Sequence, residues 1–462
     1  MELLQRVYNL VWGLPALVLI LSVGIYLTAR TRFLQLRLLP RALRLFFSRF
    51  SGKCGERDAT SFRALCTALA ATVGTGNLAG VAGAIALGGP GSIFWMWICA
   101  FLGMIIKFSE ATLALRFRAR SVSGEYVGGP MYMITGGLAS GFHPLAWIYA
   151  CFGLIAAFGV GNATQINTVV YAAGSAVSAF GADFTVYHRL LLGIILAALV
   201  GPLLLGGAKR IGAAAELLVP FAAGIYLVLG LLVLLMRAYA IPEAFAAIFR
   251  GAFTPEAVTG GAVGSIWIAL RTGVSRGVFT NEAGMGTASM AHACAKVSHP
   301  AEQGLMGIVE VFLDTIVICT VTALVILCSG VAIPYGTDPG VDLTSAAFSC
   351  VLGPWVSGII AVCLCLFALA TVLGWGLYGI RCAQFLFGHD AGRSFAWLQI
   401  ATVLLSTVLR ADAVWLLAEI VNGLMAIPNL ISLLALTPEL INLYKSYLNG
   451  GKYENLHQCQ SL

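Results

Sequence analysis

The residues best suited to bind a small polar ligand lie in two glycine-rich stretches inside apolar segments. The first stretch reads Gly74-Thr75-Gly76-Asn77, and the second, from Arg271 to Gly286, holds four glycines and three charged side chains. Glycine allows a helix to unwind locally, which exposes amides at one side of the break and carbonyls at the other. Amides suit a carboxylate, whereas carbonyl oxygens suit a cation. Together the two stretches predict a site for a zwitterion, such as an amino acid, and a companion cation.

The composition of the chain indicates that helices in a membrane position these stretches. Of the 462 residues, 59% are hydrophobic and 10% charged, against about 25% charged in a soluble domain. This excludes a soluble enzyme, a secreted disulfide scaffold and a disordered chain. Apolar segments long enough to cross a bilayer predict an all-α polytopic membrane protein with about eleven transmembrane helices, at 9–29, 62–87, 91–115, 145–176, 189–206, 211–236, 258–291, 303–333, 350–388, 394–410 and 413–437.

The predicted helices divide the chain into three parts. Residues 1–60 hold an extra N-terminal helix and a basic segment, 61–437 form the core, and 438–462 form a tail. The core splits into five helices at 62–236 and five at 258–437. Because five is odd, the two halves enter the membrane from opposite faces, as in an inverted repeat whose ligands bind between the halves near the bilayer midplane.

The basic residues predict the orientation of the chain. Most of the 27 Lys and Arg lie in segments that share one face, above all between Arg30 and Arg63. The positive-inside rule then places the N-terminus outside and the C-terminus in the cytoplasm. Arg37, Arg41 and Arg44 recur at helical spacing among Leu and Phe, which predicts an amphipathic helix on the cytoplasmic leaflet. The net charge of +7 thus sets orientation, and no nucleic-acid partner is expected.

Other interpretations of the first stretch are weaker. Thr72 to Gly76 is similar to a potassium-channel filter, but such a filter needs four copies on short re-entrant loops. The glycine spacing misses the dinucleotide-binding pattern by one residue, and no strand precedes it. Close helix packing through small residues is an alternative for this stretch taken alone. Breaks at corresponding positions in the two halves favour a transporter binding site.

Several motifs, in order along nearly the whole chain, resemble the alanine or glycine:cation symporter family. They are Gly74 to Asn77, Gly88-Gly89-Pro90-Gly91 through Trp97, Gly128 to Tyr132, Thr280 to Gly286 with Ala291-His292-Ala293, Leu313-Asp314-Thr315 and Leu373-Gly374-Trp375. The resemblance implies a leucine-transporter-type fold of five plus five helices with one extra N-terminal helix. It also implies sodium-coupled uptake of alanine and glycine across a prokaryotic cytoplasmic (inner) membrane, which is the lipid bilayer that surrounds the chain.

The general pattern of that fold implies roles for individual residues. The substrate carboxylate would meet the amides of Thr75 and Gly76, and Asn77 would give an oxygen to a cation or hold the break open. Carbonyls near Thr72 and around a second break at Gly273 and Val274 would take the ammonium group. Sodium, which prefers oxygen ligands, would be bound by the carbonyls of Ala70, Val73 and Ala368 and by the hydroxyl of Thr371. The alternative for Thr371 is a bond to its own i−4 carbonyl.

Other polar and aromatic residues have a role in the same hypothesis. Trp375 follows Thr371 by one turn, so it would close a pocket sized for a methyl group; a lipid-facing indole is the alternative. Gln165 would contact the substrate or join two helices. Glu110 would pair with Lys107 three residues before it, or form a gate. Intramembrane ion pairs are expected among Arg271, Arg276, Glu282, Glu310 and Asp314.

The function predicted from the sequence is sodium-coupled symport by alternating access, in which one helix bundle rocks against the other. The chain is not expected to be an enzyme: its twelve Cys follow no C-x-x-C spacing and it has no zinc-protease motif. No cofactor is expected beyond Na⁺ as coupling ion. The alternatives are a symporter that uses H⁺ or carries a larger amino acid, an ion channel, and a membrane receptor or scaffold without transport.

Overall fold

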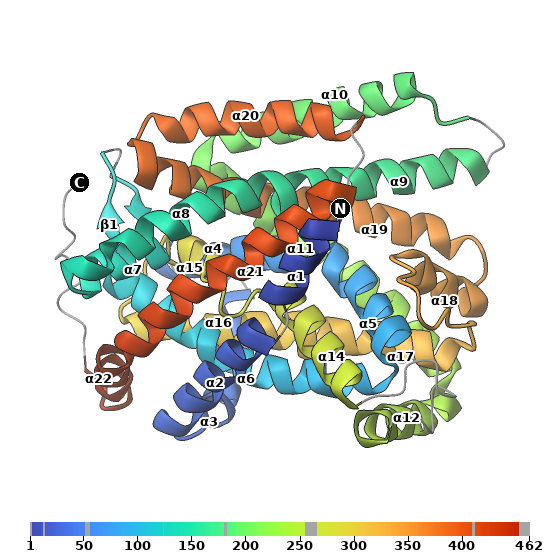
Figure 1. The fold of residues 1–462 in the computed structure, drawn as a ribbon, viewed down its shortest axis with the longest axis horizontal. Coiled ribbons are helices and arrows are strands. Elements are labelled where there is room, and N and C mark those ends of the chain that lie inside the picture. Colours follow the sequence, from blue (N-terminus) through green and yellow to red (C-terminus); the bar gives the residue numbers. More distant parts are fainter. Residues whose placement is uncertain are drawn as a thin grey trace.

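The computed structural model describes residues 2–12, 14–50, 56–122, 124–179, 183–254, 266–408 and 412–451. Nearly all of these residues lie in helices (Figure 1), as the all-α prediction requires. Strands β1 (Ala119–Arg120) and β2 (Tyr126–Val127) pair antiparallel in a short hairpin. The start of the predicted helix 258–291, part of the basic segment before residue 56, the end of the predicted helix 394–410 and the tail beyond residue 451 lie outside the described residues.

The N-terminal part contains both features that the sequence predicts, a first membrane span and an amphipathic helix after it. Helices α1 (Glu2–Val11) and α2 (Leu14–Arg30) cover the predicted first span, and α3 (Leu34–Phe50) follows it. The chain turns by 81° between α2 and α3, with Arg32 and Phe33 at positive φ. Helix α3 carries arginines on one side and exposed apolar side chains on another.

The first half of the core begins with the broken helix that the glycines predict. Helix α4 and the segment formed by η1 and α5 meet at an angle of 52°. The elements of this half are α4 (Glu56–Thr72), η1 (Gly76–Gly80), α5 (Val81–Gly88), α6 (Gly91–Arg116), α7 (Pro130–Gly137), α8 (His143–Phe158), η3 (Gly159–Ala163), α9 (Thr164–Ala179), α10 (Val186–Leu205) and α11 (Gly207–Met236).

The second half repeats this order after α12 (Ile241–Phe253), a helix that the sequence did not predict. Its elements are α14 (Ile266–Asn281), α15 (Thr287–His292), α16 (Pro300–Val311), η5 (Phe312–Cys319), α17 (Thr320–Ser329), α18 (Asp342–Leu352), α19 (Val356–Phe387), α20 (Ala391–Ser406), α21 (Asp412–Ala435) and α22 (Thr437–Leu448). Among the described residues, six helices are long and apolar enough to span a membrane, or up to nine if each of three bent pairs counts as one span. The predicted number of eleven stays a prediction.

Elements at equivalent positions in the two halves pack against one another. Helix α6 packs on α16, α8 on α19, and α10 on α20, the last pair lying side by side in Figure 1. The fifth helix of each half contacts the third helix of the other, since α11 packs on α19 and α21 packs on α8. These reciprocal contacts are the arrangement that a two-fold relation between inverted halves produces.

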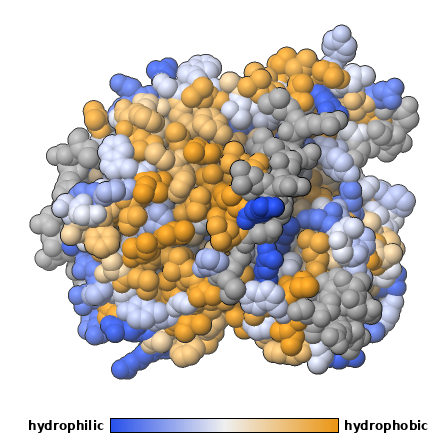
Figure 2. Space-filling model, in the orientation of Figure 1, coloured by the Kyte–Doolittle hydropathy of each residue, from blue (hydrophilic) through white to orange (hydrophobic). Residues whose placement is uncertain are grey.

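The outer surface is apolar over a broad area. Figure 2 shows a broad area of hydrophobic side chains over the left and central parts of the visible face, with hydrophilic ones along its left and lower margins and a few near its centre. On α10 and α11, Leu191, Ile194, Val228 and Leu231 are each more than half exposed. A water-soluble protein rarely exposes such a continuous apolar area, so this surface faces lipid.

Candidate functional site

The first break is held open by a side chain of the same segment. The backbone N–H of Gly74 donates to Oδ1 of Asn77 (2.8 Å) and not to the carbonyl of Ala70, four residues earlier. The N–H of Asn77 in turn donates to the carbonyl of Gly74 (3.3 Å) and not to that of Val73. The carbonyls of Ala70 and Val73, both predicted sodium ligands, therefore lose their usual helical donors.

The side chain of Asn77 also ties the break to Asp314 in η5. Its Nδ2 donates to Oδ1 of Asp314 (2.7 Å) and to the Asp314 carbonyl (3.2 Å). The hydroxyl of Thr315 donates to the other carboxylate oxygen, Oδ2 (2.7 Å). Asn77, Asp314 and Thr315 are fully buried. A carboxylate thus lies next to the unwound backbone, where its charge would favour a cation.

Helix α19 passes directly beside the first break. A Cβ on Gly74 would lie 2.8 Å from the hydroxyl oxygen of Thr371, and a Cβ on Gly374 would lie 2.9 Å from the backbone nitrogen of Ala71. Glycine at both positions permits this approach. The hydroxyl of Thr371 donates to the carbonyl of Phe367 (3.0 Å), as the alternative interpretation expected, which leaves the lone pairs of its oxygen able to accept or to bind a cation.

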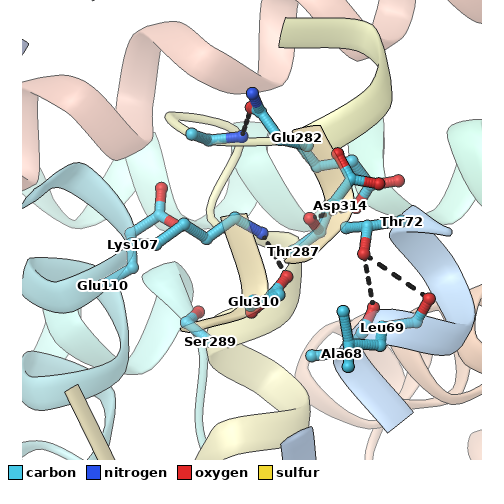
Figure 3. A network of polar contacts seen from close by, with 12 residues as sticks. Ala68, Leu69, Thr72, Lys107, Glu110, Glu282, Thr287, Ser289, Glu310 and Asp314 are labelled. Atoms are coloured by element: carbon cyan, nitrogen blue, oxygen red, sulfur yellow. Dashed lines mark hydrogen bonds and ion pairs between the residues drawn. The ribbon is translucent and has the colours of Figure 1, made fainter. Parts of the chain in front are cut away.

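The structure brings most of the predicted sodium ligands together. Ala70, Val73 and Thr371 are buried where α4 meets α19. Ala368 is also buried, three residues before Thr371 in the continuous helix α19. The predicted ligand Thr72 closes α4, and its hydroxyl bonds its own helix through the carbonyls of Ala68 (3.3 Å) and Leu69 (3.5 Å), as Figure 3 shows.

The second break lies later in the chain than predicted. Helix α14 runs without interruption to Asn281, so it includes Gly273 and Val274. The helix ends at Glu282 (φ +51°), and the chain then passes through Gly284 (φ +94°) and Gly286 (φ +77°) before α15 begins. Glu282 is one of the few non-glycine residues with positive φ, a conformation that costs about 1–2 kcal/mol. The predicted position of the break was wrong by about ten residues.

The glycines of α14 serve close helix packing instead. A Cβ on Gly273 would lie 2.2 Å from the carbonyl oxygen of Ser92 in α6, and one on Gly277 would lie 3.2 Å from Cβ of Cys99. Two small residues four positions apart form a groove on one helix face. The carbonyls of Gly273 and Val274 remain inside a regular helix, so the predicted ammonium ligands at these two positions are not supported by the structure.

Glu110 of α6 holds the second break. One oxygen, Oε1, accepts the N–H groups of Gly284 (3.0 Å) and Gly286 (3.1 Å) and the amide of Asn429 in α21 (2.7 Å). All of these bonds lie in the buried interior. A carboxylate that accepts several amides in this way fixes an unwound segment, because each buried N–H needs a partner.

The N–H groups at the second break do not donate to their usual helical acceptors. In a regular helix the N–H groups of Ala283 and Gly284 would donate to Phe279 and Thr280. Instead, Ala283 donates to the side chain of Asn281 (3.0 Å), and Gly284 donates to Glu110. A Cβ on Gly76 would lie 3.2 Å from Thr280 and 3.4 Å from Phe279. The side chains of Phe279 and Thr280 therefore adjoin the first break.

Trp375 joins the second break to α19. Its indole N–H donates to Oε1 of Glu282 (2.9 Å), while the hydroxyl of Thr287 donates to Oε2 (2.6 Å). The indole is fully buried, so it does not face lipid. It fits there because Gly161 in η3 has no side chain: a Cβ at that position would lie 2.1 Å from Cβ of Trp375.

Gln165 connects the third core helix to the first break. Its Oε1 accepts the hydroxyl of Thr75 (3.3 Å), and its Nε2 donates to the carbonyl of Val160 (3.2 Å). Gln165 and Thr75 are both buried. The predicted residues Thr75, Gly76, Asn77 and Gln165 therefore lie in one neighbourhood, although Gln165 is far from the others in the sequence.

The buried charges pair differently from the prediction. Nζ of Lys107 bonds Oε1 of Glu310 (2.8 Å), as Figure 3 shows, and not Glu110. Nε2 of His292 lies 2.9 Å from the other oxygen of Glu310. These side chains bridge α6, α15 and α16. Because Glu110 is engaged with the second break, the predicted Lys107–Glu110 pair was wrong.

The two ends of the core differ in access. Where α4 begins, a cavity of about 570 Å³ is lined by residues that include Arg63, Ala291, Leu377 and Arg381. At the end where α14 begins, Arg276 pairs with Asp338 (2.9 Å) and lies 3.8 Å from Glu419. The indole of Trp12 donates to the Glu419 carbonyl (2.7 Å). Contacts of Trp12, α14 and α21 therefore narrow this end, where a smaller cavity of about 200 Å³ remains. The larger cavity lies at the other end.

Comparison with known proteins identifies the family of this chain. The model of the sodium:alanine symporter family matches residues 1–460. The chain belongs to the sodium:alanine symporter family. It is 43% identical to the sodium/alanine symporter AgcS of Methanococcus maripaludis over 98% of both chains. It is 38% identical to the probable sodium/glutamine symporter GlnT of Bacillus subtilis, over 96% of this chain and 90% of that protein.

A solved structure supports the fold of this family member. The crystal structure of MhsT in complex with L-phenylalanine superposes with a TM-score of 0.57 at 14% identity, covering 83% of this chain and 98% of that one. At that identity the likeness shows the fold alone, the predicted leucine-transporter-type fold. The chain is thus a multi-pass membrane transporter that couples amino-acid transport to a cation, and it is not an enzyme.

Proposed function

We propose that this symporter carries alanine and glycine into the cell together with Na⁺. The main support is the diversion of the Gly74 and Asn77 amides, which leaves the carbonyls of Ala70 and Val73 without helical donors beside the hydroxyl of Thr371. Oxygens gathered in this way suit Na⁺, a hard cation. The carbonyl of Ala368 would complete the set from α19.

The substrate is proposed to bind between the two breaks. Its carboxylate would accept from the amides of Thr75 and Gly76, as the sequence predicts. Its ammonium would lie against the carbonyl of Thr72, and no longer against those of Gly273 and Val274, which lie inside α14. The support is that the side chains of Phe279 and Thr280 adjoin Gly76, which puts the end of α14 in the second half next to the first break. Gln165 would contact the substrate through its bond to Thr75.

Packing supports a preference for small side chains. Trp375 is wedged against Gly161 on one side and held by Glu282 on the other, so the indole has little room to move. Extra methylene groups in such a pocket would cost about 1–3 kcal/mol through overpacking. A relative named for glutamine makes a larger amino acid the second candidate, with H⁺ as the alternative coupling ion.

We propose the orientation that the basic residues predict, with the N-terminus outside and the C-terminus in the cytoplasm of a prokaryotic cell. The cavity that Arg63 and Arg381 line would then open to the cytoplasm, and the narrower end at Arg276 would face outside. Moving one Na⁺ across 100 mV supplies about 2.3 kcal/mol, and a tenfold Na⁺ gradient adds about 1.4 kcal/mol. Together they would sustain alanine accumulation of two to three orders of magnitude.

Uptake by proteoliposomes tests this function. Purified protein should accumulate labelled alanine under an inward Na⁺ gradient, but not under a matched K⁺ gradient or a pH gradient alone. Unlabelled alanine and glycine should compete, whereas glutamine and phenylalanine should compete weakly. Uptake driven by the pH gradient without Na⁺ would contradict sodium coupling, and strong competition by glutamine alone would contradict the proposed substrates.

A further inference from the structure

A large basic cavity lies away from the transport site, between α3, the start of α16 and α22. Its volume is about 970 Å³. Residues from all three regions line it: Arg37, Leu38, Pro40, Arg41, Arg44, Leu45, Ser48, Arg49, Lys296, Val297, Ser298, Glu302 and Tyr447. Neither the predicted sodium ligands nor the residues of the two breaks are among them, so the transport mechanism leaves this cavity without a role.

The lining of this cavity is strongly cationic. It contains five Lys and Arg but a single carboxylate, Glu302. That carboxylate is engaged, because it accepts the hydroxyl of Ser298 (2.7 Å) and lies 3.8 Å from Arg49. Three of the cations, Arg37, Arg41 and Arg44, are spaced by four and three residues, so they form one row along α3. The wall that α3 forms therefore carries three positive charges in a row.

Two arginines of this row are held in place by aromatic side chains of α22. The guanidinium of Arg41 lies 4.5 Å from the ring centre of Tyr447, and Nη1 of Arg37 donates to the hydroxyl of Tyr444 (3.4 Å). A guanidinium stacked on an aromatic ring keeps its N–H groups available for an anion. The row is thus fixed in position while its charge remains able to bind a ligand.

The exposed side chains of α3 are those of a helix that lies along the surface of a membrane. A different side of the helix exposes Leu36 (53%), Phe47 (62%) and Phe50 (56%). A helix with large exposed apolar side chains next to a basic row lies in the membrane interface with its apolar side among acyl chains. Helix α2 is the apolar helix that precedes α3, and the chain turns by 81° between them. This turn fits an α2 that crosses the membrane and an α3 that lies along its surface.

The geometry points to a binding site for the headgroup of an anionic phospholipid in this cavity. The lipid phosphate would take N–H groups from Arg37, Arg41 and Arg44, since guanidinium groups bind phosphate oxygens in pairs. Leu38 and Leu45 would contact the glycerol and upper acyl carbons. The apolar side of α3 favours a lipid over free phosphate, because it puts the cavity next to the bilayer. A bound lipid would link α3 to α16 and α22 and so stabilise the fold.

Thermal unfolding of the full-length protein in a neutral detergent tests this site. We expect dioctanoylphosphatidylglycerol to raise the Tm saturably, while dioctanoylphosphatidylcholine, which has no net charge, does so much less. The triple variant R37Q/R41Q/R44Q should raise the half-saturating phosphatidylglycerol concentration at least tenfold, because each basic residue near an anionic lipid contributes roughly a fivefold effect. Higher salt should weaken binding to the unmodified protein.

A matched triple variant separates this site from charge alone. R189Q/R250Q/R393Q removes three exposed arginines elsewhere and should leave the phosphatidylglycerol response unchanged. If R37Q/R41Q/R44Q fails to fold, the single variant R44Q should still weaken binding about fivefold. An unchanged response in the R37Q/R41Q/R44Q or R44Q variant would overturn the proposal. An equal Tm rise with phosphatidylcholine, or with inorganic phosphate at the same concentration, would overturn it as well.

Discussion

The indole N–H of Trp375 donates a 2.9 Å hydrogen bond to Oε1 of Glu282, which ties the unbroken helix α19 to the second break. The bond is buried, and Glu282 holds an unfavourable positive φ. Strained residues persist where the surrounding structure fixes them, and such positions cluster at ligand sites. Any movement of α19 relative to α14 and α15 during transport would therefore act on this bond.

Replacing Trp375 by phenylalanine should impair transport more than folding. The ring remains, but Glu282 loses one of two donors, and a hydrogen bond to a charged group contributes about 1.5–3 kcal/mol. We expect alanine uptake to fall at least tenfold. The matched control is Trp397→Phe, because Trp397 is an exposed indole on α20. Equal uptake by the two variants in proteoliposomes would rule out a role for the Trp375 bond.

Replacing Thr371 by valine should weaken the apparent affinity for Na⁺. The change keeps the shape of the side chain and removes the oxygen that faces Gly74. We expect the Na⁺ concentration for half-maximal uptake to rise about tenfold, while Thr371→Ser stays near the original value, since one lost charge-assisted contact corresponds to roughly 1.5 kcal/mol.

Thr402→Val provides the control for this experiment. The hydroxyl of Thr402 donates to its own i−4 carbonyl, Leu398 (2.9 Å), as that of Thr371 does, but it lies on the exposed side of α20. Its loss should leave the Na⁺ dependence unchanged. If Thr371→Val shows the same Na⁺ dependence as Thr402→Val, then Thr371 serves helix geometry alone.

The first break could be predicted from the sequence because its determinants are local. Gly74 and Gly76 permit the unwinding, and Asn77 three residues after Gly74 supplies the oxygen that captures its amide. The second break could not be located by the same rule, since glycines also serve close packing. Gly273 and Gly277 fit against α6, and only the position of that helix shows it. Gly284 and Gly286, which lie in the same stretch of sequence, were the residues that could have indicated where the second break lies.

The partners of the buried carboxylates could not be predicted from the sequence. Asp314 meets Asn77, and Glu110 meets Gly284, across more than 170 residues in each case. Such contacts depend on how the two halves pack, which the order of helices does not specify. The pairing of Lys107 with the neighbouring Glu110 was the local expectation, and the long-range partner Glu310 takes its place.

Replacing Gly76 by alanine should reduce uptake with little effect on expression. The added Cβ would lie 3.2 Å from Thr280 and 3.4 Å from Phe279, tight enough to push the two breaks apart by a few tenths of an ångström. We expect at least a tenfold loss of alanine uptake, because an alignment error of this kind strongly affects a preorganised site. Gly76→Leu should abolish uptake.

Gly358 offers the matched control for that substitution. It lies in α19, and a Cβ there meets nothing within 4 Å. Gly358→Ala should transport as the unmodified protein does and gain slightly in stability from better helix propensity. Normal uptake by Gly76→Ala would show that the two breaks need not be in close contact, which contradicts the proposed substrate site.

Replacing Glu110 by glutamine should loosen the second break and lower stability. Oε1 accepts three N–H groups, from Gly284, Gly286 and Asn429. The amide oxygen of glutamine accepts more weakly than a carboxylate, and the new NH₂ group needs a buried acceptor. Removing the carboxylate should therefore lower the Tm of the purified protein by several degrees, as a loss of about 1–3 kcal/mol predicts.

A role limited to stability would leave the substrate concentration for half-maximal uptake unchanged. A role in positioning the break would raise that concentration, because Glu110 accepts the N–H of Gly284, which would otherwise donate to the carbonyl of Thr280 in a regular helix. We expect the second result, with the alanine requirement rising severalfold in Glu110→Gln. Glu439→Gln is the control: its partner Arg116 (2.6 Å) lies in a partly exposed pair at the end of α6, and its loss should alter neither quantity, since exposed ion pairs contribute little.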